Sequence, residues 1–120
     1  MQKFVILIND LYYKDSIKFD TGYEIISQDI RSYMDIYAIF LRIRKSDGFD
    51  VNYFELASIK LKSNLPTQIY FPILFTTASD GNIINYGNGY MTIDGKIYIR
   101  ANSKIDGFAE VIIYSTFISV

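Results

Sequence analysis

Asp-Gly and Asn-Gly pairs recur along this chain of 120 residues, at positions 47–48, 80–81, 88–89, 94–95 and 106–107. Such pairs tolerate the positive φ that tight hairpin turns require. The segments between them are short and rich in Ile, Tyr, Phe, Val and Thr, which fit a pleated, half-buried surface. The pattern therefore predicts many short strands joined by tight turns.

These features predict an all-β fold: an antiparallel, jelly-roll-like β-sandwich that forms a single domain over residues 1–120. Half of the chain is hydrophobic and 21% is charged, a balance typical of a folded protein rather than a disordered tail. A chain of this length buries roughly two thirds of its unfolded surface, so it needs no disulfide or metal to fold.

The clearest local unit is a hairpin over residues 90–99. A two-residue type I′ turn at Asp94-Gly95 predicts four cross-strand pairs: Ile93 with Lys96, Thr92 with Ile97, Met91 with Tyr98, and Tyr90 with Ile99. Alternation then places Tyr90, Thr92, Ile97 and Ile99 on one face of the hairpin.

Three further strands are expected, at residues 36–44, 54–61 and 109–118. The first and the last are apolar on both faces, which is typical of a strand inside a sandwich or against a neighbouring subunit. Pro66 and Pro72 lie in one stretch, and because proline cannot donate to a central ladder, we expect an edge or a crossover between sheets there.

Two segments are less regular in sequence. Residues 24–32 follow a Thr21-x-x-Glu24 pattern that resembles a helix capping box, yet loop or irregular strand is the preferred interpretation over a short helix. The apolar run at residues 4–8 is too short for a signal peptide or a membrane helix, and we expect a buried strand.

Composition argues against several function classes. The chain has no cysteine and no histidine, so thiolate chemistry, His-dependent triads and the usual zinc ligands are ruled out. The net charge is -1 with no visible basic face, which argues against nucleic-acid binding. We therefore expect no enzyme activity, no cofactor and no metal; the acidic groups Asp15, Asp20 and Glu24, or Asp47 and Asp50, lack the spacing of a calcium loop.

An ordered set of motifs begins at the proline-bearing stretch. It comprises a strand ending at residues 57–61, Leu65-Pro66, Phe71-Pro72, a Gly- and Asn-rich stretch, the hairpin over 91–99, and a terminal aromatic strand at 113–117. Over residues 31–120 this order resembles the C-terminal β-sandwich modules of tail-fibre and baseplate upper proteins from phages of Gram-positive bacteria. The chain departs from that family at Phe71, where an arginine often precedes the proline, and it lacks the usual N-terminal neck.

The resemblance implies a receptor-binding head of a virion tail, made in the host cytoplasm without a signal peptide. Such heads form trimers, contact other tail or baseplate proteins, and bind host cell-wall saccharide or teichoic acid. The resemblance implies neither a nucleic-acid partner nor a membrane.

Saccharide sites use aromatic faces for sugar rings and amides for hydroxyls. Residues 80–90 are expected to form a loop that supplies both kinds of group, with Asn82, Asn85, Tyr86, Asn88 and Tyr90 as candidate ligand-binding residues. Turns routinely collect Asn, Asp and Gly, so an ordinary connection whose tyrosines cover the sandwich edge is the more frequent origin of such a stretch. Gly87-Asn88-Gly89 lacks the helix and the Lys of a phosphate-binding loop.

Three functions remain open at this point. The leading hypothesis is a non-catalytic, oligomeric adhesion module of a phage virion. A purely structural virion component, such as a collar or decoration protein, is the second. The third is a small enzyme or a phage effector that binds a host protein, and the missing His and Cys argue against its enzymatic variant.

Overall fold

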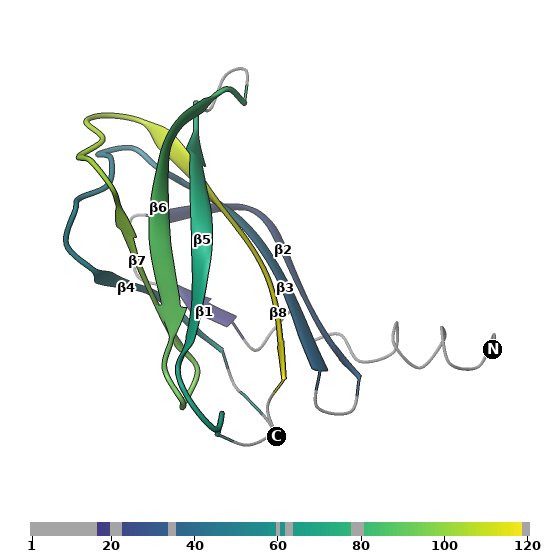
Figure 1. The fold of residues 1–120 in the computed structure, drawn as a ribbon. Coiled ribbons are helices and arrows are strands. Elements are labelled where there is room, and N and C mark those ends of the chain that lie inside the picture. The colour runs from purple at the N-terminus through teal and green to yellow at the C-terminus, as the bar shows by residue number, and fades with distance from the viewer. Residues whose placement is uncertain are drawn as a thin grey trace.

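The computed structural model describes residues 17–19, 23–33, 36–59, 61, 64–77 and 81–118. Within these ranges the chain forms eight strands and no helix. The strands are β1 (Ile17–Phe19), β2 (Tyr23–Tyr33), β3 (Ile36–Lys45), β4 (Phe54–Ile59), β5 (Ile69–Thr76), β6 (Ile83–Met91), β7 (Lys96–Ala101) and β8 (Ala109–Ile118) (Figure 1). Among the described residues, no helix is long and apolar enough to cross a membrane.

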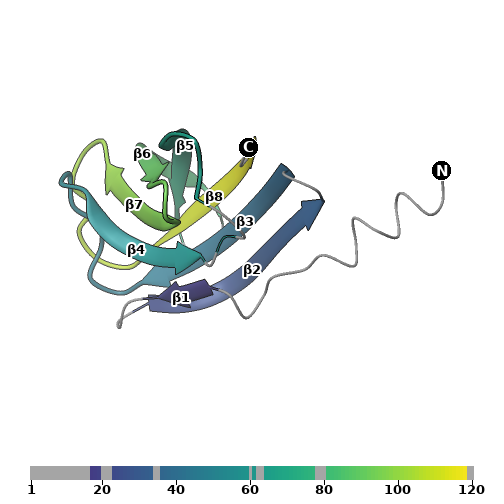
Figure 2. The same cartoon turned by 90° about the horizontal axis from the view of Figure 1, so that it is seen from below.

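The strands form one antiparallel sheet in the order β1-β4-β7-β6-β5-β8-β3-β2. The sheet curls strongly, so that β4 and β7 face β2 and β3 across the interior (Figure 2). Near the two ends of the sheet, the ring of Tyr23 in β2 stacks against Phe54 in β4 with 6.3 Å between centroids. The all-β, antiparallel fold class is confirmed, and its two layers are opposite halves of one continuous sheet.

The hydrophobic core fills the inside of this curl. Alternate residues of β3 point inward, and Tyr37 stacks on Phe117 of β8 with 5.2 Å between ring centroids. Burial of this apolar surface is the main favourable term in folding. The largest fully buried side chains are Ile30, Tyr37, Leu41, Ile43, Phe49, Leu56, Ile73, Phe75, Met91, Ile97, Ile99 and Ile113.

Strands β5 and β8 are paired over only part of their length. Their ladder holds only the pairs Leu74–Ile112, Phe75–Val111 and Thr76–Glu110, so the first half of β5 pairs with β6 alone. Pro72 lies in that first half, opposite Asn88 of β6. The expected edge position of this proline is therefore confirmed, although β5 as a whole lies in the middle of the sheet order.

The predicted register of the β6–β7 hairpin is wrong by one residue. Met91 pairs with Ile97 and Tyr90 with Tyr98. The loop has three residues, 93–95, because the Thr92 N–H donates to the Lys96 carbonyl and Gly95 has a φ of 93°. A one-residue slip exchanges the faces of a strand, and this register places Met91 and Ile97 together in the core.

Residues 23–33 form the irregular strand preferred over a helix. A bulge between Ile25 and Ser27 interrupts the pairing of β2 with β3. A second bulge, between Glu55 and Ala57 of β4, buries both Leu56 and Ala57, which simple alternation does not predict. The expected strand at residues 4–8 and the acidic residues Asp15 and Asp20 lie outside the described residues.

A charged cluster lies on the outer face where β3, β8 and β5 meet. The Glu110 carboxylate is fully buried and accepts hydrogen bonds from Arg42 Nε at 2.7 Å and Arg44 Nε at 3.0 Å. Burial acts to raise the pKa of Glu110, but the bonds from Arg44 and Arg42 outweigh it and hold that pKa below its ordinary value. The Arg44 guanidinium also lies over the Phe108 ring, 5.3 Å from its centroid.

Candidate ligand-binding face

The expected loop at residues 80–90 is wrong for most of its length, because residues 83–91 are strand β6, paired with both β5 and β7. Gly87 and Gly89 make room for aromatic rings of β5 rather than for a turn. A Cβ on Gly89 would lie 2.4 Å from Phe71 Cε2, and one on Gly87 would lie 2.2 Å from the Arg100 carbonyl oxygen of β7 and 2.7 Å from Phe75 Cε2. The two glycines therefore allow both rings to pack directly against β6.

The five candidate residues separate into two groups. Tyr86, Asn88 and Tyr90 alternate with the buried glycines and share the outer face of β6. Asn85 points away from that face and donates from Nδ2 to the carbonyl and hydroxyl oxygens of Ser103, both at 2.8 Å. Asn82 precedes the strand, and its carbonyl accepts a hydrogen bond from the Thr77 N–H at 2.9 Å. The structure thus brings together three of the five.

Tyrosines from three neighbouring strands meet around Tyr90. Tyr90 stands opposite Tyr70 of β5 on one side and opposite Tyr98 of β7 on the other. The Tyr90 ring stacks on Tyr98 with 5.1 Å between centroids, and lies 5.8 Å from the Tyr70 ring. We call these three residues, with Tyr53 and Tyr86, the tyrosine face.

Tyr53 reaches the same place from the loop before β4. The loop is anchored by the paired backbones of Phe49 and Ile105 and by the Ala101 N–H, which donates to the Asp50 carbonyl at 2.9 Å. The rings of Tyr53 and Tyr90 pack edge to face, with 4.9 Å between their centroids. The Arg100 guanidinium of β7 lies over the Tyr53 ring, 4.8 Å from its centroid.

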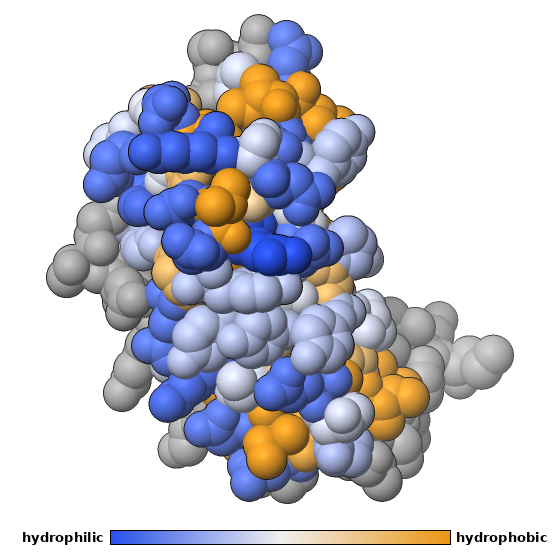
Figure 3. Space-filling view, turned by 60° about the vertical axis from the view of Figure 1, so that its left-hand side comes forward, coloured by the Kyte–Doolittle hydropathy of each residue, from blue (hydrophilic) through white to orange (hydrophobic). Residues whose placement is uncertain are grey.

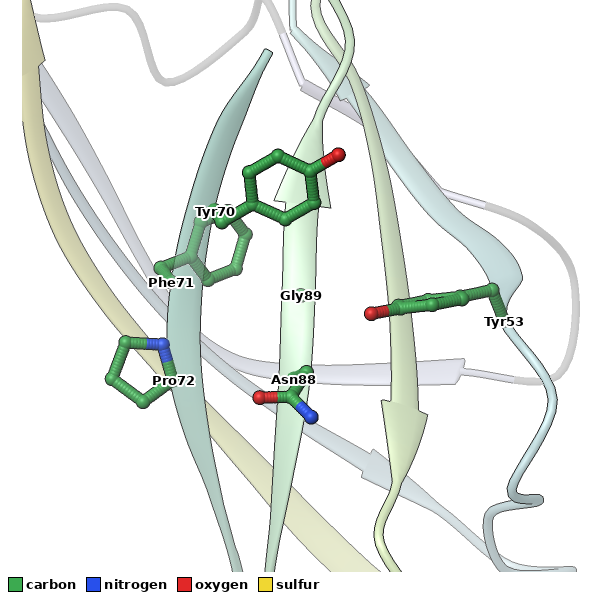
Figure 4. A pocket seen from close by; sticks show the side chains of 6 residues that line it. All are labelled: Tyr53, Tyr70, Phe71, Pro72, Asn88 and Gly89. Atoms are coloured by element: carbon green, nitrogen blue, oxygen red, sulfur yellow. The ribbon is translucent and has the colours of Figure 1, made fainter.

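A hollow of about 300 Å³ lies between these side chains, lined by Tyr53, Tyr70, Phe71, Pro72, Asn88 and Gly89. It arises because the short residues Pro72, Asn88 and Gly89 are flanked by tyrosines. In Figure 4, the Tyr70 ring lies over the end of β6 beyond Gly89, whereas Tyr53 extends towards Asn88 and Gly89 from one side. The hollow therefore offers aromatic walls and one amide.

Most of the polar groups on this face are neutral. Partial burial and, to a lesser extent, the neighbouring phenols of Tyr98, Tyr53 and Tyr70 raise the pKa of Tyr90. Tyr90 therefore remains a neutral phenol at physiological pH. The Asn88 amide lies 3.4 Å from Asn102 Oδ1. Figure 3 shows the side of the molecule that carries β4, β6 and β7, where pale side chains of intermediate hydropathy form a broad group among polar ones.

Sequence reasoning missed Tyr53, Tyr70, Tyr98 and Arg100. The signal for Tyr98 and Arg100 was present, since both alternate with buried isoleucines along β7. The wrong hairpin register hid it, because it placed Tyr90 opposite Ile99 instead of Tyr98. Nothing in the sequence indicates that Tyr53 contacts Tyr90, because the two residues are distant in sequence.

The arrangement suits stacking and hydrogen bonding rather than metal chemistry. Among the described residues there is no group of three or more His, Cys, Asp or Glu side chains that could hold a metal ion. Exposed aromatic rings beside an amide can contact the C–H face of a sugar and its hydroxyls.

No protein-family model and no curated protein matches the chain. Among solved structures, it is similar to the head domain of phage bIL170, described with the receptor-binding domains of lactococcal phages. The TM-score is 0.66 at 14% sequence identity, over 88% of this chain and 96% of that one. The chain therefore shares the fold of this head domain. The resemblance to head-like modules of phages of Gram-positive bacteria is thereby confirmed at the level of the fold.

Proposed function

We propose that the protein is a non-catalytic adhesion head of a phage tail, located in the virion, that binds a host cell-surface saccharide or teichoic acid. The observation that carries the proposal is the tyrosine face with its hollow, on the outside of a fold shared with a receptor-binding head domain. Tyr86 and Tyr70 are 57% and 70% exposed, so their rings are available to a ligand.

Each part of the face has a separate role in this proposal. The rings of Tyr70 and Tyr53 stack on the apolar faces of sugar units. The Asn88 amide, between them, exchanges hydrogen bonds with hydroxyl groups. Since the hollow is shallow, one copy binds weakly, and affinity for a cell surface comes from several copies acting together.

The proposal includes a trimer that joins other tail or baseplate proteins. Strands β3 and β8 bury one face in the core and leave apolar side chains on the other, at Ile36, Tyr114 and Ile118, which are 48%, 72% and 59% exposed. Neighbouring copies in an oligomer would cover such a surface. This surface is separate from the tyrosine face, so self-association leaves the ligand site accessible.

The test is a calorimetric titration of the purified protein with cell-wall polysaccharides from a panel of Gram-positive strains, including lactococci. We expect binding to at least one strain, and Tyr70→Ala or Asn88→Ala to weaken it about tenfold. Tyr114→Ala is the matched control, because it removes an exposed tyrosine from the other surface. With short polysaccharide fragments, which report one site at a time, this control should bind like the wild type.

The same experiment separates the alternatives. If no strain's polysaccharide binds, the adhesion proposal is wrong. Stable self-association without saccharide binding would then point to a collar or decoration protein, and capture of one host protein by a monomer would point to an effector.

A further inference from the structure

We propose that Arg100 makes the tyrosine face selective for saccharides that carry an acidic group, either a carboxylate or a phosphate. Because the residue acts on the ligand of the adhesion face, this role rests on the proposed function. What is new is a single side chain that decides between charged and neutral ligands.

Arg100 lies at the border of the hollow. It stands opposite Asn88 in the β6–β7 ladder, and Asn88 lines the hollow. Its guanidinium is 4.8 Å from the ring centroid of Tyr53, which lines the hollow as well. A ligand that fills the hollow therefore comes close to this positive charge.

No described carboxylate neutralises that charge. Arg31, Arg42 and Arg44 each pair with an Asp or Glu within 4.0 Å, whereas Arg100 forms no such pair. Glu55 of β4 is the cross-strand partner of Tyr98, which precedes Arg100 by two residues on β7, and Glu55 makes no ion pair with Arg100. The hollow is thus bordered by an uncompensated cation.

The guanidinium has lost part of its hydration without a full replacement. Arg100 is half-buried, and its Nε is a buried donor with no hydrogen-bond partner among the described groups. A partly desolvated, unpaired charge raises the free energy of the site, and an anion beside it lowers that energy. A neutral sugar offers no such compensation.

Tyr53 prepares the arginine for this role. The guanidinium lies over the ring of Tyr53. Such a contact limits the conformations of the arginine, so less conformational entropy is lost when it binds a ligand. Arginine pairs with carboxylate and with phosphate through charge-assisted hydrogen bonds, often bidentate. Both anions therefore fit, and experiment has to distinguish them.

The probe is a set of short fragments, each no longer than one repeating unit, of a cell-wall polysaccharide that the wild-type protein binds. The fragments are used in three forms that do not differ in length: native, freed of phosphate with a phosphatase, and carboxyl-reduced. We expect one treatment to weaken wild-type binding about tenfold, and which treatment does so identifies the acidic group. We also expect Kd for the native form to rise with ionic strength.

Variants assign the effect to one residue. Arg100→Gln should weaken binding of the native fragments about tenfold and leave binding of the neutralised fragments within about twofold. Arg100→Lys should recover part of the loss, since it keeps the charge but not the planar fork. Lys96→Gln is the matched control: it removes an exposed cation from the same strand and should change neither affinity.

The outcomes distinguish the role of Arg100 from the proposed adhesion function. A wild type that binds native and both neutralised fragments equally overturns the role of Arg100 and leaves adhesion standing. Equal weakening of native and neutralised fragments by Arg100→Gln also overturns it, because the arginine then does not distinguish charged from neutral ligands. A wild type that binds no polysaccharide overturns both proposals.

Discussion

The ring of Tyr90 in β6 lies parallel to the ring of Tyr98 in β7, with 5.1 Å between centroids and 11° between planes. This contact exists because Met91 pairs with Ile97, which turns both tyrosines outward and both of those apolar residues inward. The same hairpin register thus builds the core on one side of the sheet and the candidate ligand-binding face on the other.

The turn that sets this register depends on Gly95. Gly95→Ala should destabilise the fold by about 3 kcal/mol, because φ is 93° and the new Cβ would lie 2.2 Å from the Ile59 carbonyl oxygen. Gly107→Ala is the matched control: its φ is 85° but nothing lies within 4 Å of the added Cβ, so we expect only about 1 kcal/mol. Urea unfolding measures both. Equal losses would contradict the close contact at Gly95.

The packing beneath the hollow depends on Gly89. Gly89→Ala places a methyl group against the Phe71 ring and should lower the free energy of unfolding by about 2 kcal/mol. Because the obstacle is a side chain, Phe71→Leu in the same molecule should recover part of the loss. An additive double variant, measured by chemical denaturation, would show that the two positions do not meet.

Sequence reasoning recovered the fold more completely than the site. A run of β-branched and aromatic residues was sufficient for the strands at residues 36–44 and 109–118, although both are apolar on both faces in sequence and alternate little. The site failed for two reasons. The Asn88-Gly89 pair was interpreted as turn chemistry, although Gly89 serves close packing against Phe71. Tyr70 meets Tyr90 through the register of β5 with β6, and Tyr53 meets it from the loop before β4; local sequence patterns encode neither contact.

Glu110 gives the fold a pH-dependent stability. Its folded pKa is depressed, so its contribution is fully present above the unfolded pKa of about 4.3 and is lost as pH falls through the lower folded pKa. Glu110→Gln should lower the free energy of unfolding at pH 7 by roughly 2 kcal/mol, limited by the partial exposure of its arginine partners. The difference from wild type should shrink below pH 4.

Asp106→Asn is the matched control for Glu110, because the Asp106 side chain is 86% exposed and, among the described residues, pairs with Lys104 alone, at 3.8 Å. Its effect should stay within about 0.5 kcal/mol at every pH. A Glu110→Gln difference that is constant from pH 7 to pH 3 would contradict the ionic contribution.

The apolar outer surface of β3 and β8 predicts self-association, and the proposed function makes that oligomer a trimer. Light scattering behind a sizing column should give three times the chain mass of 13.9 kDa. Tyr114→Glu, at an exposed position, should give a folded single chain because it places a charge in the subunit contact. Tyr70→Ala should leave the mass unchanged. A monomeric wild type would remove the trimer from the account.

The most direct test of the central claim is to map the binding surface by NMR. Amide shifts of the ¹⁵N-labelled protein would be followed while short cell-wall polysaccharide fragments are added. We expect shifts at Tyr70, Asn88, Tyr90 and Tyr98, with Tyr114 and Ile118 unaffected. Shifts confined to Tyr114 and Ile118, or none at saturating fragment, would contradict the assignment of the tyrosine face as the host-binding surface.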